Sequence, residues 1–269
     1  MRLRSSLKVI LLSLSLSFPA QALLAQTPTA AAPIRDAQAI TVIQNSMTAM
    51  GGQNLSGVAN IQETITLTDL ENGTSSTAAA TITANQSNAF RSDVQDSSGN
   101  NLTTIWTEGR AQMQSASGVE ELPRSAFGNA GLTHIPLLSV LSHWQDPEIA
   151  LQYVGLETIG SSSAYHLRLQ SPLDPSLGLG AYDLPCDFYI DSQSFFVTRL
   201  IYAVRSPADL SKASAITANY GNYTSVSGLM IPFSVNYTSG DNLLVSQTVQ
   251  SAVVNAPISS SQFQFAVGE

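Results

Sequence analysis

The chain has 269 residues, of which 43% are hydrophobic and only 11% are charged, and its formal net charge is −8. Globular domains usually contain about a quarter charged residues, so Ser, Thr, Asn and Gln must supply most of the polar surface. A surface of this acidic kind argues against nucleic acid and against anionic lipid headgroups as main partners.

The start of the chain has the pattern of an export signal. Arg2, Arg4 and Lys8 precede an apolar run over residues 9–18, and Ala20-Gln21-Ala22 forms a small-x-small cleavage site. The apolar run is too short to span a bilayer. The resulting division is a signal peptide at residues 1–22, a flexible lead-in at 23–34 and a single β domain at 35–269.

Removal of this signal would take the formal charge from −8 to −11 and leave Lys212 as the only lysine. Because of this export signal, we expect a periplasmic or secreted protein. Cys186 is the only cysteine, so no intrachain disulfide can form. It alternates with Phe188 and Ile190, which favours a buried, unreactive thiol over a reactive one.

Residues 36–50 have the pattern of an amphipathic helix. Apolar side chains recur every three or four residues at Ile40, Ile43, Met47 and Met50. Asp36 is suited to the N-cap, and Gly51-Gly52 is a strong stop signal. The apolar stripe favours contact with the core, and a lid over a cavity is the alternative.

From residue 58 the hydrophobic period changes to two, which is the period of a β-strand. Turn-forming residues such as Asn72-Gly73 separate the strands, which predicts one antiparallel sheet of roughly ten strands. The stretch 186–237 is expected to supply four consecutive strands at the centre of this sheet. The predicted strands are residues 58–68, 76–84, 90–94, 102–107, 110–114, 150–158, 164–170, 186–190, 195–202, 215–226, 231–237, 243–254 and 262–265.

Three further segments do not follow the strand pattern. Residues 118–131 are expected to be irregular, and residues 136–144 to form a short second helix with an apolar stripe. Residues 171–184 are rich in Pro and Gly, which is typical of a long loop that could act as a flap. Glu63 interrupts an otherwise apolar strand face, so we expect it near the solvated end of its strand.

The sequence contains no recognisable catalytic or metal-binding motif. His134, His143 and His166 lie on different predicted elements, away from any His or Cys at ligand spacing, and are expected at the surface. Asp187 and Asp191 share one strand face and could bind a cation together, although plain solvation is favoured. We therefore expect no enzyme activity, no metal and no cofactor.

The remaining functional feature is apolar sheet surface. A sheet of about ten strands has more apolar face than two short helices can cover. A second sheet, a partner protein or a bound apolar ligand could close that excess. The equal alternative is a fully packed sandwich or barrel core, which needs neither a partner nor a ligand to cover it.

The order of elements resembles the LolA-type lipoprotein carriers and their relatives in the outer-membrane lipoprotein-sorting superfamily. The shared features are an export signal, a helix that ends at a Gly pair, and a long meander. The segments that carry the resemblance are Ala89-Phe90-Arg91, Thr107-Glu108-Gly109, Phe188-Tyr189-Ile190-Asp191, Val197-Thr198-Arg199, Gly228-Leu229-Met230-Ile231-Pro232 and 255–263.

This resemblance implies a mainly β fold, an open antiparallel half-barrel with two short helices as a lid. It also implies an apolar concavity for acyl chains, with neither cofactor nor catalysis, and it suggests Arg91 as a lid latch. The long 171–184 loop and the scarcity of lysine are departures from the family pattern.

Two hypotheses of function follow. The first is a periplasmic binding or carrier protein for a lipid or lipoprotein acyl chain, and the second is a structural or sensory envelope protein that binds a protein partner. The candidate ligand-binding residues are Phe90, Ile105, Met113, Leu138, Leu141, Trp144, Phe188, Phe195, Ile231 and Phe233.

Overall fold

The computed structural model describes residues 33–71, 74–85, 89–107, 110–122, 135–138, 144–170, 185–206 and 209–265. The predicted signal peptide, nearly all of the lead-in and the 171–184 loop lie outside these residues, as do His134 and His143. Their boundaries therefore stay predictions.

The predicted N-terminal helix is confirmed as α1 (Ala37–Met50). Asp36 caps it, because its carboxylate accepts a hydrogen bond from the backbone N–H of Gln38 at 2.8 Å. The helix ends at Gly51, whose N–H donates to the carbonyl of Met47. A 3-10 helix that the sequence did not predict, η1 (Gly52–Gly57), follows directly.

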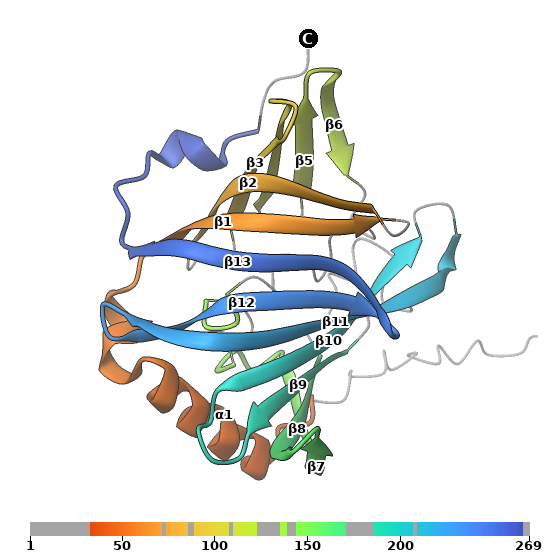
Figure 1. The fold of residues 1–269 in the computed structure, drawn as a ribbon. Helices are drawn as coiled ribbons and strands as arrows, with labels where there is room; N and C mark the ends of the chain where they lie inside the picture. Colours follow the sequence, from red (N-terminus) through yellow and green to blue (C-terminus); the bar gives the residue numbers. More distant parts are fainter. Residues whose placement is uncertain are drawn as a thin grey trace, which may run out of the picture. The chain divides into compact units, whose positions relative to one another are not determined.

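Most of the described chain is β-strand, and these strands form one antiparallel sheet (Figure 1). Its order in the described residues is β6-β5-β4-β3-β2-β1-β13-β12-β11-β10-β9-β8-β7, thirteen strands where roughly ten were expected. The strands are β1 (Asn60–Glu71), β2 (Thr74–Asn85), β3 (Phe90–Asp96), β4 (Asn101–Thr107), β5 (Arg110–Ser115), β6 (Gly118–Leu122), β7 (Ala150–Ile159), β8 (Ser162–Gln170), β9 (Cys186–Asp191), β10 (Val197–Ser206), β11 (Asp209–Val226), β12 (Leu229–Ser239) and β13 (Asn242–Val254).

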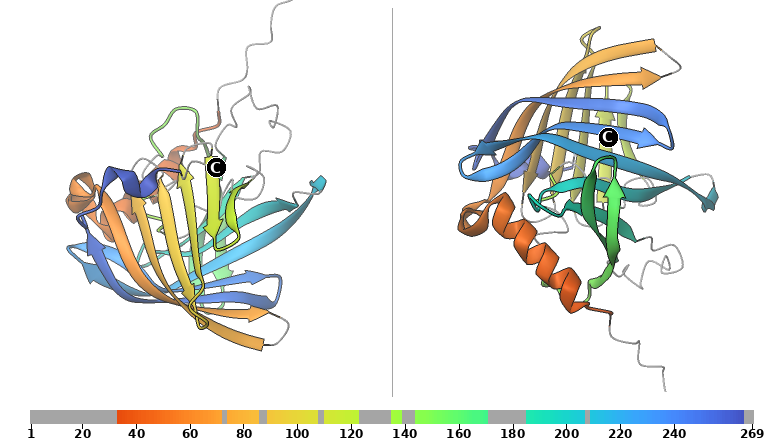
Figure 2. Two further views of the ribbon diagram at one scale, coloured as in Figure 1. Left: turned by 90° about the horizontal axis from the view of Figure 1, so that it is seen from above. Right: turned by 60° about the horizontal axis from the view of Figure 1, so that its bottom comes forward.

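The sheet curves strongly and does not close on itself, so the predicted mainly β, open half-barrel is confirmed (Figure 2). Its middle strand is β13, which pairs on one side with β12 and on the other with β1. The expectation that residues 186–237 occupy the centre was therefore wrong. The pairing of β1 with β13 joins the first and the last described strand in chain order. Local sequence patterns carry no information on a pairing between segments so far apart in sequence.

Three local predictions also need correction. Residues 118–122 form β6 and are not irregular. Residues 262–265 are not a strand, because η5 (Ser260–Phe263) is a 3-10 helix whose N-cap Ser259 accepts a bond from the N–H of Ser261. Residues 136–138 of the predicted second helix form a turn, and residues 139–143 lie outside the described part of the chain.

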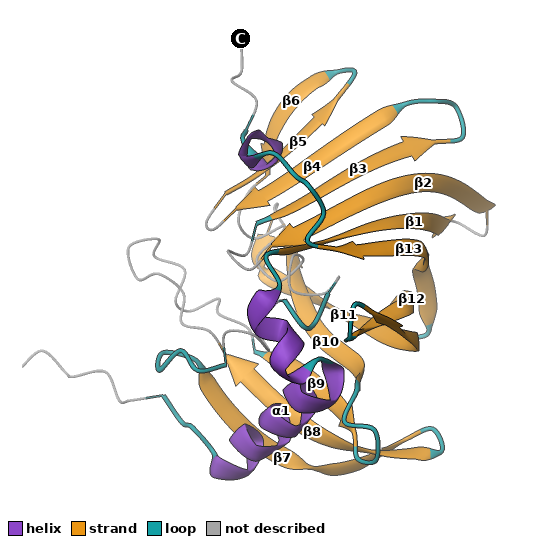
Figure 3. Ribbon diagram, turned by 90° about the vertical axis from the view of Figure 1, so that its left-hand side faces the viewer, coloured by secondary structure: helices purple, strands orange, loops and turns teal. Residues whose placement is uncertain are grey.

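The two faces of the sheet differ in character. We call inner the face that carries Ile61, Ile65, Phe188, Leu200 and Val235, all fully or almost fully buried, and outer the opposite face. Helix α1 lies across the inner face, where it contacts β7 and β12 (Figure 3). Its buried apolar residues belong to the same hydrophobic cluster as the inner-face residues and the turn at residues 135–138. This face is therefore the main core.

Cys186 lies on the inner face and is buried, as predicted. No helix within the described residues is long and apolar enough to cross a membrane.

Candidate functional site

The apolar inner face is the candidate site, and most of the predicted ligand-binding residues lie on it. Strand alternation places the side chains of Phe90, Met113, Phe188, Ile231 and Phe233 there. Leu138, Trp144 and Phe195 pack against the same hydrophobic cluster from turns.

Two of the predicted residues stand apart from this group. Ile105 is opposite Arg91 in the β3–β4 pairing, so its side chain lies on the outer face, where it is buried. Leu141 is outside the described residues. The inner face therefore unites eight of the ten candidates, and their role in binding stays a prediction.

Burial of the inner face decreases along the strands. Ile61 and Ile65 on β1 are fully buried, whereas Leu67 on the same side is only half-buried. On β3 Phe90 is buried and Val94 is half-buried. The apolar surface therefore continues beyond the part that α1 and the turn segments cover.

Aromatic side chains mark two ends of this surface. Phe90 packs against Trp106 of the neighbouring strand, with 4.4 Å between ring centroids. At the other end of the sheet Phe195 stacks on Tyr165 at 5.8 Å. Phe195 has a positive φ of 58°, which is unusual for a residue with a large side chain. The Asp191 carboxylate supports this turn by accepting hydrogen bonds from Gln193 and Ser194.

One inner-face residue is polar where the sequence led us to expect solvent. Glu63 is only 1% exposed, and neither of its carboxyl oxygens has a hydrogen-bond partner in the described part of the chain. Burial raises the pKa of this carboxyl to about 8, because the charged form is poorly solvated there. The expectation of a solvated position was wrong, and Glu63 is uncharged at neutral pH.

Sequence reasoning missed two further polar groups on the inner face. Gln247 of β13 is fully buried, and neither its amide nitrogen nor its amide oxygen has a partner among the described residues. The indole Nε1 of Trp106 is likewise buried and without a partner there. The alternation Val245-x-Gln247-x-Val249 could have revealed the buried Gln247, since it places one amide side chain in a row of apolar side chains.

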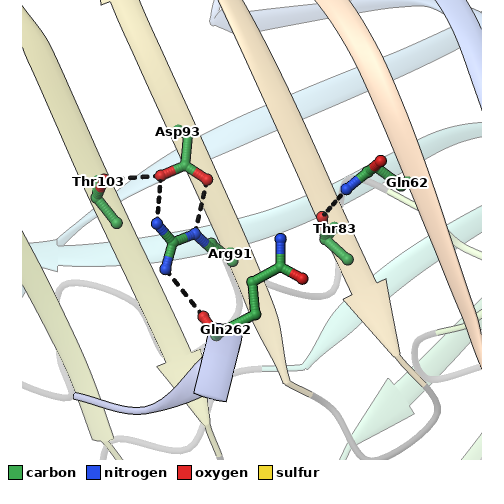
Figure 4. Close-up of polar contacts among 6 residues, drawn as sticks. All are labelled: Gln62, Thr83, Arg91, Asp93, Thr103 and Gln262. Carbon is green, nitrogen blue, oxygen red and sulfur yellow. Dashed lines mark hydrogen bonds and ion pairs between the residues drawn. The ribbon is translucent and has the colours of Figure 1, made fainter. Parts of the chain in front are cut away.

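The predicted latch residue Arg91 lies on the outer face (Figure 4). Its guanidinium donates to both carboxylate oxygens of Asp93, at 2.6 and 2.7 Å, and to the carbonyl of Gln262 at 3.0 Å. Burial acts to raise the pKa of Asp93, but hydrogen bonds from Arg91 and Thr103 outweigh it and lower that pKa. The segment that Arg91 holds is therefore the C-terminal one around η5, and not α1.

A second polar cluster lies on the outer face of β7–β9. His166 is 5% exposed, its Nδ1 is 2.6 Å from Glu157 Oε1, and its Nε2 is 3.0 Å from Asp187 Oδ1. Arg168 also donates to Asp187, with its Nε at 2.8 Å from Oδ1. The expected surface position of His166 was wrong, since paired carboxylates and the stacked ring of Tyr189 enclose it.

The same cluster accounts for Asp187, which was considered as half of a cation site. It is paired with cationic Arg168 instead, whereas Asp191 caps a turn. Within the described residues no group of three or more His, Cys, Asp or Glu side chains is arranged to hold a metal ion.

No protein-family model matches the sequence, and no curated protein is detectably similar to it. Solved structures are similar in fold at low identity. A LolA superfamily protein from Nitrosomonas europaea matches with a TM-score of 0.57 and 11% identity, over 84% of this chain and 97% of its own.

Two more solved structures agree with this match. A putative outer membrane lipoprotein-sorting protein domain from Vibrio parahaemolyticus gives a TM-score of 0.55 at 7% identity, over 83% of this chain and 95% of its own. A DUF1329 family protein from Desulfovibrio piger gives 0.57 at 8% identity, over 84% and 97% respectively. The resemblance predicted from the sequence is thereby confirmed at the level of architecture, and the chain has the fold of the LolA superfamily proteins.

Proposed function

We propose that the protein is a periplasmic binding or carrier protein for a lipid or lipoprotein acyl chain. The observation that carries this proposal is the apolar inner face, which extends past its helical cover to half-buried Leu67, Val94 and Trp106. The fold shared with LolA superfamily and lipoprotein-sorting proteins supports it. The export signal predicted from the sequence supports the location.

The chemistry of this face suits a long hydrocarbon chain. Each methylene moved from water to an apolar surface contributes about 0.8 kcal/mol, so one acyl chain could give useful affinity without any charged contact. Half-buried Trp106, Val94 and Leu67 offer flat aromatic and aliphatic contacts of the kind that such a chain requires.

Native mass spectrometry of the delipidated protein with added phospholipid tests the proposal. We expect a stoichiometric lipid adduct that survives desolvation. The absence of an adduct, together with no binding of a fluorescent lipid, would rule the function out.

A matched pair of variants locates the binding face. Val94 is half-buried on the inner face, and its neighbour Gln95 is exposed on the other side of the same strand. Val94→Lys should abolish the adduct because it places an ammonium group on the hydrocarbon path, whereas Gln95→Lys should leave the adduct unchanged.

The second candidate function is an envelope protein that binds a protein partner. The edge strand β7 favours it, because Val154 and Leu156 there are 42% and 57% exposed, and edge strands with exposed apolar side chains are sites of pairing. A pull-down from envelope extract separates the two ideas. A carrier recovers lipid, whereas a partner-binding protein recovers one stoichiometric polypeptide that Leu156→Ser releases.

A further inference from the structure

The inner face holds an ionisable group surrounded by aliphatic side chains. Glu63 lies directly opposite Ile82 of β2 and Ala252 of β13, and Ile61 and Ile65 flank it along β1. With 1% exposure and no hydrogen-bond partner in the described part of the chain, its carboxyl group is desolvated without compensation.

Gln247 repeats this situation on the neighbouring strand β13. It lies opposite Leu67 on β1 and Val235 on β12, and all four hydrogen-bonding positions of its amide lack a partner within the described residues. A buried polar group left unpaired is strongly disfavoured in folding. Two such side chains on adjacent strands of one face are therefore unexpected unless something else satisfies them.

The kind of group that would satisfy them follows from their donors. Because burial raises the pKa of Glu63 to about 8, its carboxyl carries a proton at neutral pH and can donate. Gln247 donates through its amide nitrogen, and the indole Nε1 of Trp106, also without a described partner, can only donate. A carbonyl oxygen is an acceptor that any of the three can bind.

The charge distribution disfavours an anion at the same place. Strand pairing places four arginines of β3, β5, β8 and β10 on the outer face. These are Arg91, Arg110, Arg168 and Arg199. Desolvation raises the pKa of Glu63 with no opposing contribution from any described cation, so a carboxylate or phosphate buried beside Glu63 would lack a charged partner.

We propose that Glu63 and Gln247 each hydrogen-bond an uncharged polar linkage of an acylated ligand, an ester or amide carbonyl that joins an acyl chain to its headgroup. The inference rests on the proposed function and specifies its ligand class. The acyl linkage enters the inner face together with the chain, whereas a free fatty-acid anion is discriminated against.

Isothermal titration calorimetry at pH 7 with two probes of equal chain length tests this class. The probes are 1-monolauroylglycerol, which is an uncharged ester, and laurate, which is an anion. We expect the delipidated protein to bind the ester at least tenfold more tightly than the anion. Equal affinity, or tighter binding of laurate, would overturn the inference.

Variants then test the two residues. Glu63→Met and Gln247→Met keep the side-chain volume but remove the hydrogen bond. Because monolauroylglycerol has a single ester carbonyl, at least one of the two should weaken its binding on the order of tenfold. Gln250→Met is the matched control, since Gln250 is an exposed glutamine on the same strand. Unchanged ester affinity in both test variants would overturn the assignment.

Failure of this inference can be told apart from failure of the proposed function. If the unmodified protein binds neither probe, the carrier proposal itself is lost. If both probes bind and the ester has no advantage, only the assigned ligand class is lost. The comparison of the two probes needs no variant, so it does not depend on how Glu63→Met folds.

Discussion

Glu63 lies directly opposite Ile82 on the neighbouring strand, so a carboxyl group and a fully buried isoleucine share the interior of the sheet. An ionised carboxylate is unstable in such surroundings, and the group stays protonated up to about pH 8. The stability of the protein is thereby tied to the proton on one side chain.

Unfolding free energy should fall as pH rises from 4.5 to 8. The pKa of Glu63 is raised from 4.5 to about 8 in the folded state, so between these values the folded chain holds a proton that the unfolded chain has lost. The unfolding free energy therefore falls by about 1.4 kcal/mol for each pH unit in this range. Urea unfolding at several pH values measures it.

The isosteric variant Glu63→Gln isolates this contribution, because it cannot ionise. Its stability relative to the unmodified protein should increase steadily from pH 5 to pH 8 and then level off. A difference between the two proteins that does not change with pH would contradict the buried, protonated carboxyl.

The cluster around Asp187 should stabilise the fold at neutral pH. Burial acts to raise the pKa of Asp187, but contacts with Arg168 and His166 outweigh it and lower that pKa. Asp187→Asn should therefore cost roughly 1–3 kcal/mol at pH 7, and the cost should fade as pH falls below the ordinary value of 3.8. Chemical denaturation at pH 7 and pH 3 checks both statements.

The exposed pair of Arg110 and Glu121 is the matched control for this cluster. Solvent screens it, so Glu121→Gln should change stability by less than about 0.5 kcal/mol. Equal costs for the two substitutions would mean that the Asp187 cluster is no more than a surface ion pair.

Arg91 should hold the C-terminal segment on the outer face. Arg91→Lys keeps the charge but loses the two-pronged contact with Asp93 and the bond to the Gln262 carbonyl. We expect a loss of about 1 kcal/mol, since both side chains are partly solvated. Hydrogen exchange of residues 256–265 should accelerate more than that of β1. An equal acceleration in both segments would contradict the role of Arg91 in holding the C-terminal segment.

Gly228 should resist substitution more than Gly240 does. Both glycines have positive φ at turns, but a Cβ on Gly228 would lie 2.5 Å from Asn54 Nδ2, whereas one on Gly240 would meet open space. Gly228→Ala should therefore cost about 1 kcal/mol more, because Asn54 loses its bond to the Gly228 carbonyl. Thermal melts of the two variants decide this, and equal melting points would contradict docking of η1 on this turn.

Local patterns predicted the strands well because turn chemistry and period-2 alternation are local properties. Asp36 and Gly51 bounded α1 correctly for the same reason. The sequence predicted a strand at residues 262–265, yet the Ser259 cap makes residues 260–263 a 3-10 helix. The pairing of β1 with β13 joins strands from the two ends of the sheet-forming sequence, and no single segment encodes it.

The candidate site was only partly predictable. Alternation identified which residues line an apolar face, but Ile105 was assigned to it although its parity matches Arg91 and the outer face. Glu63 was placed in solvent because buried carboxylates are rare. Only the pairing of β1 with both β2 and β13 reveals that its position is enclosed.

Fluorescence quenching of Trp106 tests acyl-chain binding on the inner face most directly. Trp106 and Trp144 are the only tryptophans, so Trp144→Phe leaves a single reporter that packs against Phe90. An acylglycerol with a brominated chain should quench this emission in a saturable manner, whereas the same lipid without bromine should not. Equal emission with the two lipids at saturating concentration would show that the chain does not reach this face.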